Sequence, residues 1–277
     1  MLEQTMSAYK KTATLTMNRH DNAVNKLSPN YLKQKIIEGQ RVVGTWLQSG
    51  NSTFAEMIGF SALDFFIIDQ EHGPGDLQTV IDMARAAAFS KTTAVVRCPG
   101  IDIIYIKRLI EAGIEAILVP MVETADQAAA IVEACRFPPL GKRGDAAHVT
   151  RSSYYGFVQD YHQHASDKLM IMIQIETKEG VNNAAEILSV AGIDLVFVGP
   201  SDLAGSINEL GNTGSEGVTR LINQVINIAK KYDIPLGTVP RDTKTAEELF
   251  EDGFSLISVG SDVACYFDFL QNIIKQE

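Results

Sequence analysis

The sequence predicts a (β/α)8 barrel, an α/β fold in which eight parallel strands alternate with helices in a TIM-barrel arrangement. Eight short β-branched runs alternate with longer, helix-like segments, and most of these runs are apolar on both faces. Such runs are typical of parallel strands that helices cover. The repeat is about 31 residues long, and residues 28–277 match the ~250 residues of this fold. An open doubly wound sheet is the alternative, but no GxGxxG segment follows an early run.

A short helix is expected before the first strand. Ser28 and Pro29 resemble an N-cap and a first helical residue, and the helix should end near Gly39. Residues 1–27 lack the apolar segment of a secretory signal, so we expect a flexible tail, with a transit peptide as the alternative. The predicted strands are Val42 to Trp46, Phe65 to Asp69, Thr93 to Arg97, Ala116 to Val119, Leu169 to Glu176, Leu195 to Val198, Leu236 to Val239 and Leu256 to Gly260.

The interval between the fourth and fifth strands is unusually long. Its middle, Phe137 to Gly144, holds proline and glycine at a density that excludes a regular helix. We expect an extended loop on the face that holds the active site and no second domain, so that residues 28–277 form one barrel.

Charge and cysteine content exclude several classes of protein. The chain has 277 residues and a formal net charge of −10, which would repel nucleic acids and anionic membranes. No run of ~18 apolar residues could span a membrane. Cys98, Cys135 and Cys265 form neither a zinc pattern nor a disulfide framework. We therefore expect ordinary thiols in a reducing, cytoplasmic compartment.

Polar side chains gather at the carboxyl ends of the predicted strands, whereas the strand interiors are aliphatic. In a parallel barrel these ends meet at one face, where the chemistry of the fold takes place. The sequence therefore predicts an active site there. The residues concerned are Trp46, Asp69, Glu71, His72, Arg97, Gln174, Glu176, Gly199, Ser201 and Asp202.

Glu176 and Asp202 are the candidate metal ligands. The period of a strand places Glu176 on the same face as Met172 and Gln174, at the mouth of the barrel. A buried carboxylate needs a cation or a proton, and two carboxylates on neighbouring loops suit Mg²⁺ or Mn²⁺. The alternatives are that Asp202 caps a helix and that Glu176 pairs with Lys178.

His72 and Arg97 are the candidate catalytic groups. A carboxylate beside His72, such as Asp69 three residues earlier, would fix the imidazole tautomer and favour a general base. The guanidinium of Arg97 suits a carboxylate or a developing enolate. A structural histidine and a structural ion pair of Arg97 are the alternatives. Backbone amides at Gly199 and Ser201 would favour a carboxylate at a helix start.

Taken in order, these segments resemble the HpcH/HpaI aldolase family of metal-dependent class II pyruvate aldolases. The similarity extends over roughly residues 40 to 265. The matching motifs are Gly44 to Trp46, Phe65 to His72, Val96 to Pro99, Leu118 to Pro120, Phe137 to Gly144, Gln174 to Thr177 and Gly199 to Leu203.

The resemblance implies a role for each matching residue. Glu176 and Asp202 would hold the divalent ion, Mg²⁺ or Mn²⁺ with Co²⁺ or Zn²⁺ as alternatives. His72 and Asp69 would form the dyad that acts as general base, and Arg97 would face the pyruvate oxygen. Contacts with the oxo acid and its water would come from Trp46, Glu71, Gln174, Gly199 and Ser201.

The expected activity is cleavage or formation of 4-hydroxy-2-oxo acids from pyruvate and an aldehyde. Three alternatives stay open: a Schiff-base aldolase, for which only Lys178 lies at the correct end, a citrate-forming or acyl-CoA lyase, and a non-catalytic barrel. The resemblance also implies a homohexamer. Phe267, Phe269 and Leu270 would then contact another subunit, or alternatively pack on their own barrel.

Overall fold

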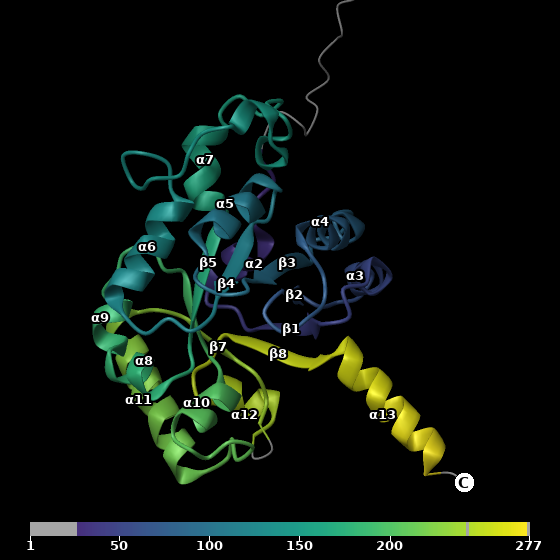
Figure 1. The fold of residues 1–277 in the computed structure, drawn as a ribbon, viewed down its shortest axis with the longest axis vertical. Coiled ribbons are helices and arrows are strands. Elements are labelled where there is room, and N and C mark those ends of the chain that lie inside the picture. The colour runs from purple at the N-terminus through teal and green to yellow at the C-terminus, as the bar shows by residue number, and fades with distance from the viewer. Residues whose placement is uncertain (1–26, 242–243, 276–277) are drawn as a thin grey trace, which may run out of the picture.

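The computed structural model describes residues 27–241 and 244–275. Its strands are parallel and close into a barrel in the order of the chain, with helices around the outside (Figure 1). This confirms the predicted (β/α)8 fold. The strands are β1 (Val42–Leu47), β2 (Phe65–Asp69), β3 (Thr93–Arg97), β4 (Ala116–Val119), β5 (Met170–Ile175), β6 (Leu195–Val198), β7 (Leu236–Thr238) and β8 (Leu256–Ser261). The helices are α2 (Tyr31–Ile37), α3 (Ser52–Gly59), α4 (Leu77–Ala86), α5 (Ile103–Glu111), α6 (Ala125–Cys135), α7 (Tyr161–Lys168), α8 (Lys178–Asn182), α9 (Ala184–Leu188), α10 (Pro200–Ser206), α11 (Glu216–Tyr232), α12 (Ala246–Glu251) and α13 (Asp262–Ile274).

Alternate side chains of each strand pack inside and outside the barrel. Phe65 and Ile67 of β2 lie in the interior cluster, whereas Phe66 and Ile68 pack in the larger cluster that includes the surrounding helices. All four side chains are buried. Both faces of the strand are therefore apolar, which explains why the sequence shows continuous apolar runs rather than alternating polar and apolar residues. The predicted bounds of β2, β3, β4 and β6 are those observed; β1, β7 and β8 differ by one residue at one end, and β5 is one residue shorter at each end. Because apolar side chains fill the interior, ligands can reach only the two ends of the barrel.

Helix α2 covers the amino end of the barrel. Its N-cap is Asn30 rather than the predicted Ser28, and the Asn30 side chain accepts a hydrogen bond from Lys33 N. The same side chain donates to the carbonyl oxygens of Glu115 (2.8 Å) and Lys168 (3.1 Å), which precede β4 and β5. The sequence pattern did not identify Asn30 as the cap, because its side chain is held in place by the carbonyl oxygens of Glu115 and Lys168, which are distant in sequence. The predicted tail lies outside the described residues, apart from Leu27.

The long connection between β4 and β5 lies at the amino end of the barrel, and its predicted placement on the active-site face is wrong. Its irregular part runs from the end of α6 to α7 and so returns to the start of β5. Within it the Arg151 guanidinium donates to Ala112 O at 3.2 Å, at the end of α5. The helix-free character predicted for Phe137 to Gly144 is confirmed. Two 3-10 turns follow, Ala147–Val149 and Arg151–Ser153.

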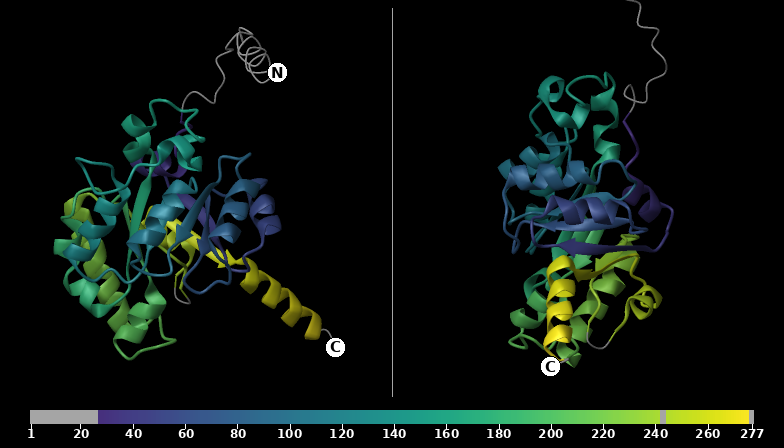
Figure 2. Two further views of the ribbon diagram at one scale, coloured as in Figure 1. Left: turned by 45° about the horizontal axis from the view of Figure 1, so that its top comes forward. Right: turned by 90° about the vertical axis from the view of Figure 1, so that its right-hand side faces the viewer.

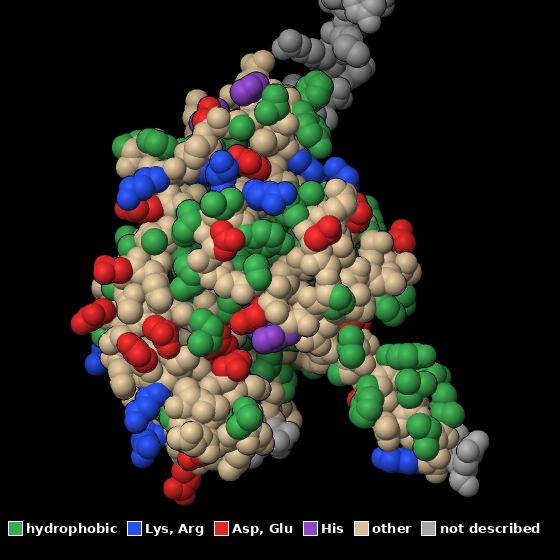
Figure 3. All heavy atoms as spheres, in the orientation of Figure 1, with side chains coloured by type: hydrophobic (Ala, Val, Ile, Leu, Met, Phe, Trp, Pro, Cys, Tyr) green, Lys and Arg blue, Asp and Glu red, His purple; other side chains and the backbone are tan. Residues whose placement is uncertain are grey.

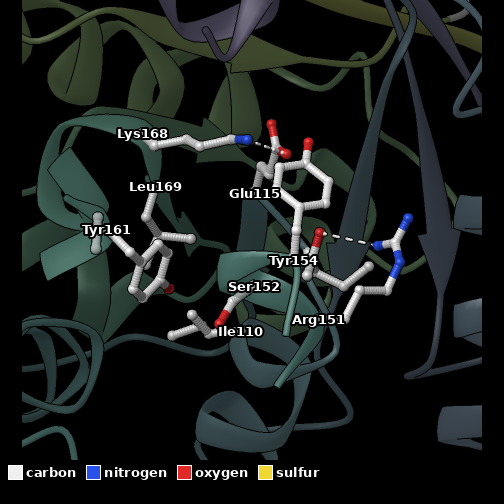
Figure 4. A pocket seen from close by; sticks show the side chains of 11 residues that line it. Ile110, Glu115, Arg151, Ser152, Tyr154, Tyr161, Lys168 and Leu169 are labelled. Carbon is white, nitrogen blue, oxygen red and sulfur yellow. Dashed lines mark hydrogen bonds and ion pairs between the residues drawn. The ribbon is translucent and has the colours of Figure 1, made fainter. Parts of the chain in front are cut away.

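A small pocket of about 50 Å³ lies under this connection (Figure 4). Glu115 and Lys168 form an ion pair of 2.7 Å in its wall, and Tyr154, Tyr161 and Ile110 line it. Burial raises the pKa of Glu115, with Lys168 and Arg151 opposing the shift. The pocket therefore belongs to the packing at the amino end, opposite the predicted site.

Helix α13 projects away from the barrel (Figure 1; Figure 2). No residue of α13 is buried, so the alternative that Phe267, Phe269 and Leu270 pack on their own barrel is wrong. Apolar side chains cover much of the visible helix surface (Figure 3). Along the described parts of the chain, we find no helix with the length and apolarity needed to cross a bilayer.

Candidate active site

Asp69 and Arg97 form a buried pair at the carboxyl ends of two neighbouring strands. They face each other in the register of β2 and β3. Arg97 Nε and Nη2 donate to Asp69 Oδ1 and Oδ2 at 3.0 Å and 2.7 Å, the bidentate geometry that binds a carboxylate most firmly. Burial works against ionisation of Asp69, but the hydrogen bonds and charge of Arg97 outweigh it and hold the pKa of Asp69 below its ordinary value. The pair is therefore ionised at neutral pH.

Asp69 also organises the loop after β2. Its Oδ1 accepts hydrogen bonds from the backbone N–H groups of Glu71 and His72, both at 3.1 Å. The predicted contact between Asp69 and the imidazole of His72 is not formed, because Arg97 and these amides occupy the carboxylate. Asp69 thus holds His72 by its backbone and leaves the ring free.

Glu71 is the carboxylate near the His72 ring. Its Oε2 lies 3.8 Å from His72 Nε2 and 3.0 Å from Arg97 Nη1. Burial raises the pKa of Glu71, the charges of Arg97 and His72 lower it, and those of Asp69 and Asp202 raise it further. The side chain of His72 is 60% exposed, so a ligand at the mouth of the barrel can reach it.

Trp46 supports Arg97 from β1. The guanidinium carbon of Arg97 lies 4.5 Å from the centre of a Trp46 ring, a cation–π contact. Trp46 in turn packs edge to face on Phe197. The expected structural ion pair of Arg97 is present, yet only two of its five N–H groups donate hydrogen bonds among the described residues, both to Asp69, while Nη1 lies 3.0 Å from Glu71 Oε2 as an ion pair. The indole contact orients the guanidinium, and N–H groups remain for a ligand.

Glu176 follows β5 and is 1% exposed. Its Oε1 accepts a hydrogen bond from Met121 N at 2.8 Å, and its Oε2 accepts one from Gln174 Nε2. Burial raises the pKa of Glu176 to about 7, the Met121 amide opposes the shift, and the charges of Glu71 and Asp202 add to it. The described lysines and arginines form no ion pair with Glu176, so the alternative of a Glu176–Lys178 pair is wrong.

Asp202 lies in the first turn of α10 and does not cap it. The N-cap is Gly199, with Pro200 in the first turn, and no side chain caps this helix. Ser201 and Asp202 are exposed at the same rim. Repulsion from Asp202 contributes to the raised pKa of both Glu176 and Glu71. The acids that follow β2, β5 and β6 therefore lie close enough to act on one another electrostatically.

Gly199 leaves the space beside Glu176 open. A Cβ atom at this position would lie 2.6 Å from Glu176 Oε2 and 2.7 Å from Gln174 Nε2, closer than real contacts allow. Only glycine therefore lets the start of α10 approach these side chains.

The donor set around Glu176 fits a hard divalent cation. Gln174 Oε1 is buried and has no hydrogen-bond partner among the described residues. Glu176 carries a buried carboxylate with which no described lysine or arginine pairs, and Asp202 supplies a second carboxylate. Within residues 27–241 and 244–275 no group of three acidic, histidine or cysteine side chains stands ready for a metal. Mg²⁺ commonly needs only one or two carboxylates and takes its other oxygens from water and substrate.

Two residues that support the site were not foreseen. Met121 has a positive φ of 57° and thereby turns its N–H toward Glu176. Gln48 Nε2 donates to Asp69 Oδ2 at 3.2 Å. A backbone donor leaves no pattern in a sequence, but Gln48 is a polar residue directly after β1, and that signal was available.

Comparison with known proteins identifies the family. The sequence profile of the HpcH/HpaI aldolase/citrate lyase family matches residues 42–268. The chain belongs to this family. It is 37% identical to the 5-keto-4-deoxy-D-glucarate aldolase of Klebsiella pneumoniae, over 87% of this chain and 94% of the relative. It is 38% identical to the hydroxypyruvate/pyruvate aldolase of Agrobacterium fabrum, over 84% and 88%.

A solved HpcH/HpaI aldolase/citrate lyase family protein from Burkholderia cenocepacia superposes with a TM-score of 0.85 at 32% identity. The match covers 89% of this chain and 98% of that one. The predicted membership of the HpcH/HpaI family, and with it a carbon–carbon lyase of the aldolase class, is confirmed.

Proposed function

We propose that this aldolase cleaves and forms 4-hydroxy-2-oxo acids, with pyruvate and an aldehyde as the partners of the reaction. The observation that carries the proposal is the position of Glu71, which lies 3.0 Å from Arg97 Nη1 and acts electrostatically on Glu176, a buried carboxylate with which no described lysine or arginine pairs. A 2-oxo acid presents two adjacent oxygens and a carboxylate charge, which suit this combination of a guanidinium and a cation site.

We infer that Glu176 and Asp202 hold a divalent ion, Mg²⁺ or Mn²⁺. When bound, such an ion polarises the ketone of the oxo acid and stabilises negative charge on its oxygen. The raised pKa of Glu176 supports this assignment, because a cation would relieve the repulsion that Glu71 and Asp202 exert. Gln174 Oε1 supplies a further oxygen at the same place.

The other side chains divide the remaining work. Arg97 places its free N–H groups at the mouth of the barrel, where they offset charge that develops on the oxo acid. His72 removes the proton of the 4-hydroxyl group in cleavage and returns it in condensation. Glu71, whose Oε2 lies 3.8 Å from His72 Nε2, would orient the ring and order a water molecule beside it, in place of the Asp69 contact expected from the sequence.

The substrate itself would contact the remaining rim residues. We assign Gln174, Gly199 and Ser201 to the oxo-acid end, and Trp46 to the wall behind Arg97. The relatives named above act on a keto-deoxy sugar acid and on hydroxypyruvate or pyruvate. A hydroxylated, polar aldehyde is therefore the class of partner that we expect here.

A screen of purified protein tests the proposal. Pyruvate release is measured from a panel of 4-hydroxy-2-oxo acids, with and without EDTA and with Mg²⁺ or Mn²⁺ added back. The proposal expects cleavage of at least one hydroxylated oxo acid, its loss with EDTA and its return with metal. Absence of cleavage across the panel in metal-loaded protein would contradict it.

The same preparation separates the alternatives. A Schiff-base aldolase would be trapped by borohydride with pyruvate, but Lys178 is exposed in the first turn of α8. We expect no adduct. A citrate-forming lyase would instead consume oxaloacetate with an acetyl donor. A non-catalytic barrel would retain its metal affinity and show no lyase activity after Glu176→Ala.

We also propose a homo-oligomer, a hexamer by family resemblance, with α13 as the contacting element. Tyr266, Phe267, Phe269 and Ile274 are each more than half exposed, which is unusual for a helix of an isolated barrel. The three free cysteines fit the cytoplasm as the compartment. Sedimentation analysis would establish the number of subunits.

A further inference from the structure

We propose that Gln48 and Asp262 are positioning residues that hold the Asp69–Arg97 pair in its working geometry and connect it to the start of α13. The inference rests on the proposed function of Arg97. It concerns two side chains outside the predicted site that, in the part of the chain the structure describes, form no hydrogen bond or ion pair with Glu176, Asp202 or His72.

The first step is the contact between Asp262 and the loop after β1. Asp262 is the first residue of α13, and its two carboxylate oxygens accept hydrogen bonds from consecutive backbone amides. Oδ1 binds Gln48 N at 2.8 Å and Oδ2 binds Ser49 N at 3.1 Å. Both bonds involve an ionised acceptor and are therefore stronger than neutral ones. Asp262 thus fixes the backbone from which the Gln48 side chain extends.

The second step is the contact between Gln48 and Asp69. Gln48 Nε2 donates to Asp69 Oδ2 at 3.2 Å, and the same oxygen accepts the 2.7 Å bond from Arg97 Nη2. Oδ2 has no other donor among the described residues. Without Gln48, Asp69 Oδ2 would lose this hydrogen bond. The carboxylate could then rotate together with the guanidinium that is bound to it.

The character of the donor matters as well. The amide of Gln48 is neutral, so it supports the carboxylate without competing with Arg97 for its charge. An ammonium group at the same position would pair with Asp69 and weaken its hold on Arg97. Gln48 therefore serves orientation rather than charge balance.

The third step concerns the other end of the chain of contacts. Beyond Asp262, helix α13 leaves the barrel and buries none of its residues. Whatever packs on α13 therefore acts on a segment whose first residue is bonded to the loop that carries Gln48. The order of contacts runs from α13 through Asp262, Gln48 and Asp69 to Arg97.

The experiment compares Gln48→Ala and Asp262→Ala with Ser261→Ala in the full-length, metal-loaded enzyme. Ser261 is the matched control, because its Oγ caps α13 by accepting from Ala264 N at 3.0 Å and, among the described residues, forms no hydrogen bond with the loop after β1. We expect both test variants to raise KM for the oxo acid about five- to tenfold and to lower kcat. Affinity for Mn²⁺, measured by calorimetry, should stay within twofold of wild type. Asp262→Asn retains one good acceptor and should show a smaller effect.

A second readout does not depend on turnover. The Nε–H resonance of Arg97 in ¹⁵N spectra reports its bond to Asp69, and its exchange with water should be faster in Gln48→Ala and Asp262→Ala than in Ser261→Ala. Unchanged KM, kcat and exchange in the two test variants would overturn the inference. So would an equal effect of Ser261→Ala, which would mean that only the helix start matters. If wild type cleaves no oxo acid, the proposed function fails, while the exchange of Arg97 still decides whether Gln48 and Asp262 hold it.

Discussion

The imidazole of His72 lies 3.8 Å from the carboxylate of Glu71, whereas the Asp69 carboxylate binds only the backbone N–H of His72. The acid that can orient the ring is therefore Glu71. Asp69 serves the loop and Arg97. Because Asp69 and Glu71 have these different contacts, substitutions of the two acids should have different effects on activity and stability.

His72→Gln should lower kcat for aldol cleavage about 10²- to 10⁴-fold, the usual contribution of a general base. Glu71→Gln should have a smaller effect in the same direction, because the ring would remain but lose its orienting charge. Steady-state assays with one oxo acid would measure both. The control is Mn²⁺ affinity in His72→Gln, which should not change. Full activity of His72→Gln would remove this residue from the mechanism.

Asp69→Asn should destabilise the fold at pH 7 by about 3–5 kcal/mol, because it leaves Arg97 buried without its main charge partner. The pKa of Asp69 is held below its ordinary value of 3.8, so its ionisation stabilises the folded state above that pH. This contribution is lost as pH falls through the lowered pKa. The difference between wild type and variant in urea unfolding should therefore narrow as pH falls below 3.8. A difference that stays constant over this range would contradict the argument.

Glu176→Gln should abolish divalent-ion binding and cleavage while stabilising the metal-free protein above neutral pH. Burial raises the pKa of Glu176 from 4.5 to about 7, so the folded state of wild type loses stability as pH rises through this window. A pKa that differs by one between the folded and unfolded states corresponds to roughly 1.4 kcal/mol of unfolding free energy. Urea unfolding with EDTA at pH 5 and pH 8 would test this, with added Mg²⁺ as the control. Stabilisation by Mg²⁺ is expected for wild type alone.

Arg97→Lys keeps the positive charge but loses the bidentate bond to Asp69 and the flat contact with Trp46. We expect kcat/KM to fall about 100-fold, with most of the loss in kcat if the guanidinium acts on developing charge. Initial rates over a range of oxo-acid concentrations would separate the two constants. An increase in KM alone would instead assign Arg97 to substrate binding.

Phe267→Asp combined with Phe269→Asp should dissociate the proposed homo-oligomer without unfolding the barrel. Both side chains are exposed by 57% and 58%, so their replacement costs the isolated barrel little, within about 0.5 kcal/mol. Sedimentation would report the loss of subunits, and circular dichroism would confirm the fold. Val149→Asp, at an exposed apolar residue of the amino end, is the control that should leave the assembly intact.

Much of the architecture followed from the sequence because parallel strands leave a strong local signal. Phe65 to Asp69 and Thr93 to Arg97 are apolar until a charged residue ends each strand, and the observed strands end at the same residues. Since parallel strands point the same way, these terminal residues had to meet. The convergence of Asp69, Arg97 and the loop that carries Glu176 depends on topology alone.

Other features depend on tertiary contacts that the sequence does not encode locally. The Asp69 carboxylate binds the Arg97 side chain rather than the His72 ring because the register of β2 and β3 places Asp69 beside Arg97. The N–H of Met121 reaches Glu176 because of one left-handed residue. The position of the long connection was wrong because its glycines and prolines indicate irregular chain without indicating at which end of the barrel it lies.

The separation of this connection from Arg97 and Glu176 has a practical consequence. Residues 136–160 join elements at the amino end, so exchanging this stretch for that of another aldolase should alter thermal resistance while leaving the choice of aldehyde untouched. Thermal stability could thus be changed by substitutions at the amino end of the barrel, and substrate selectivity by substitutions at the carboxyl end, without one change affecting the other.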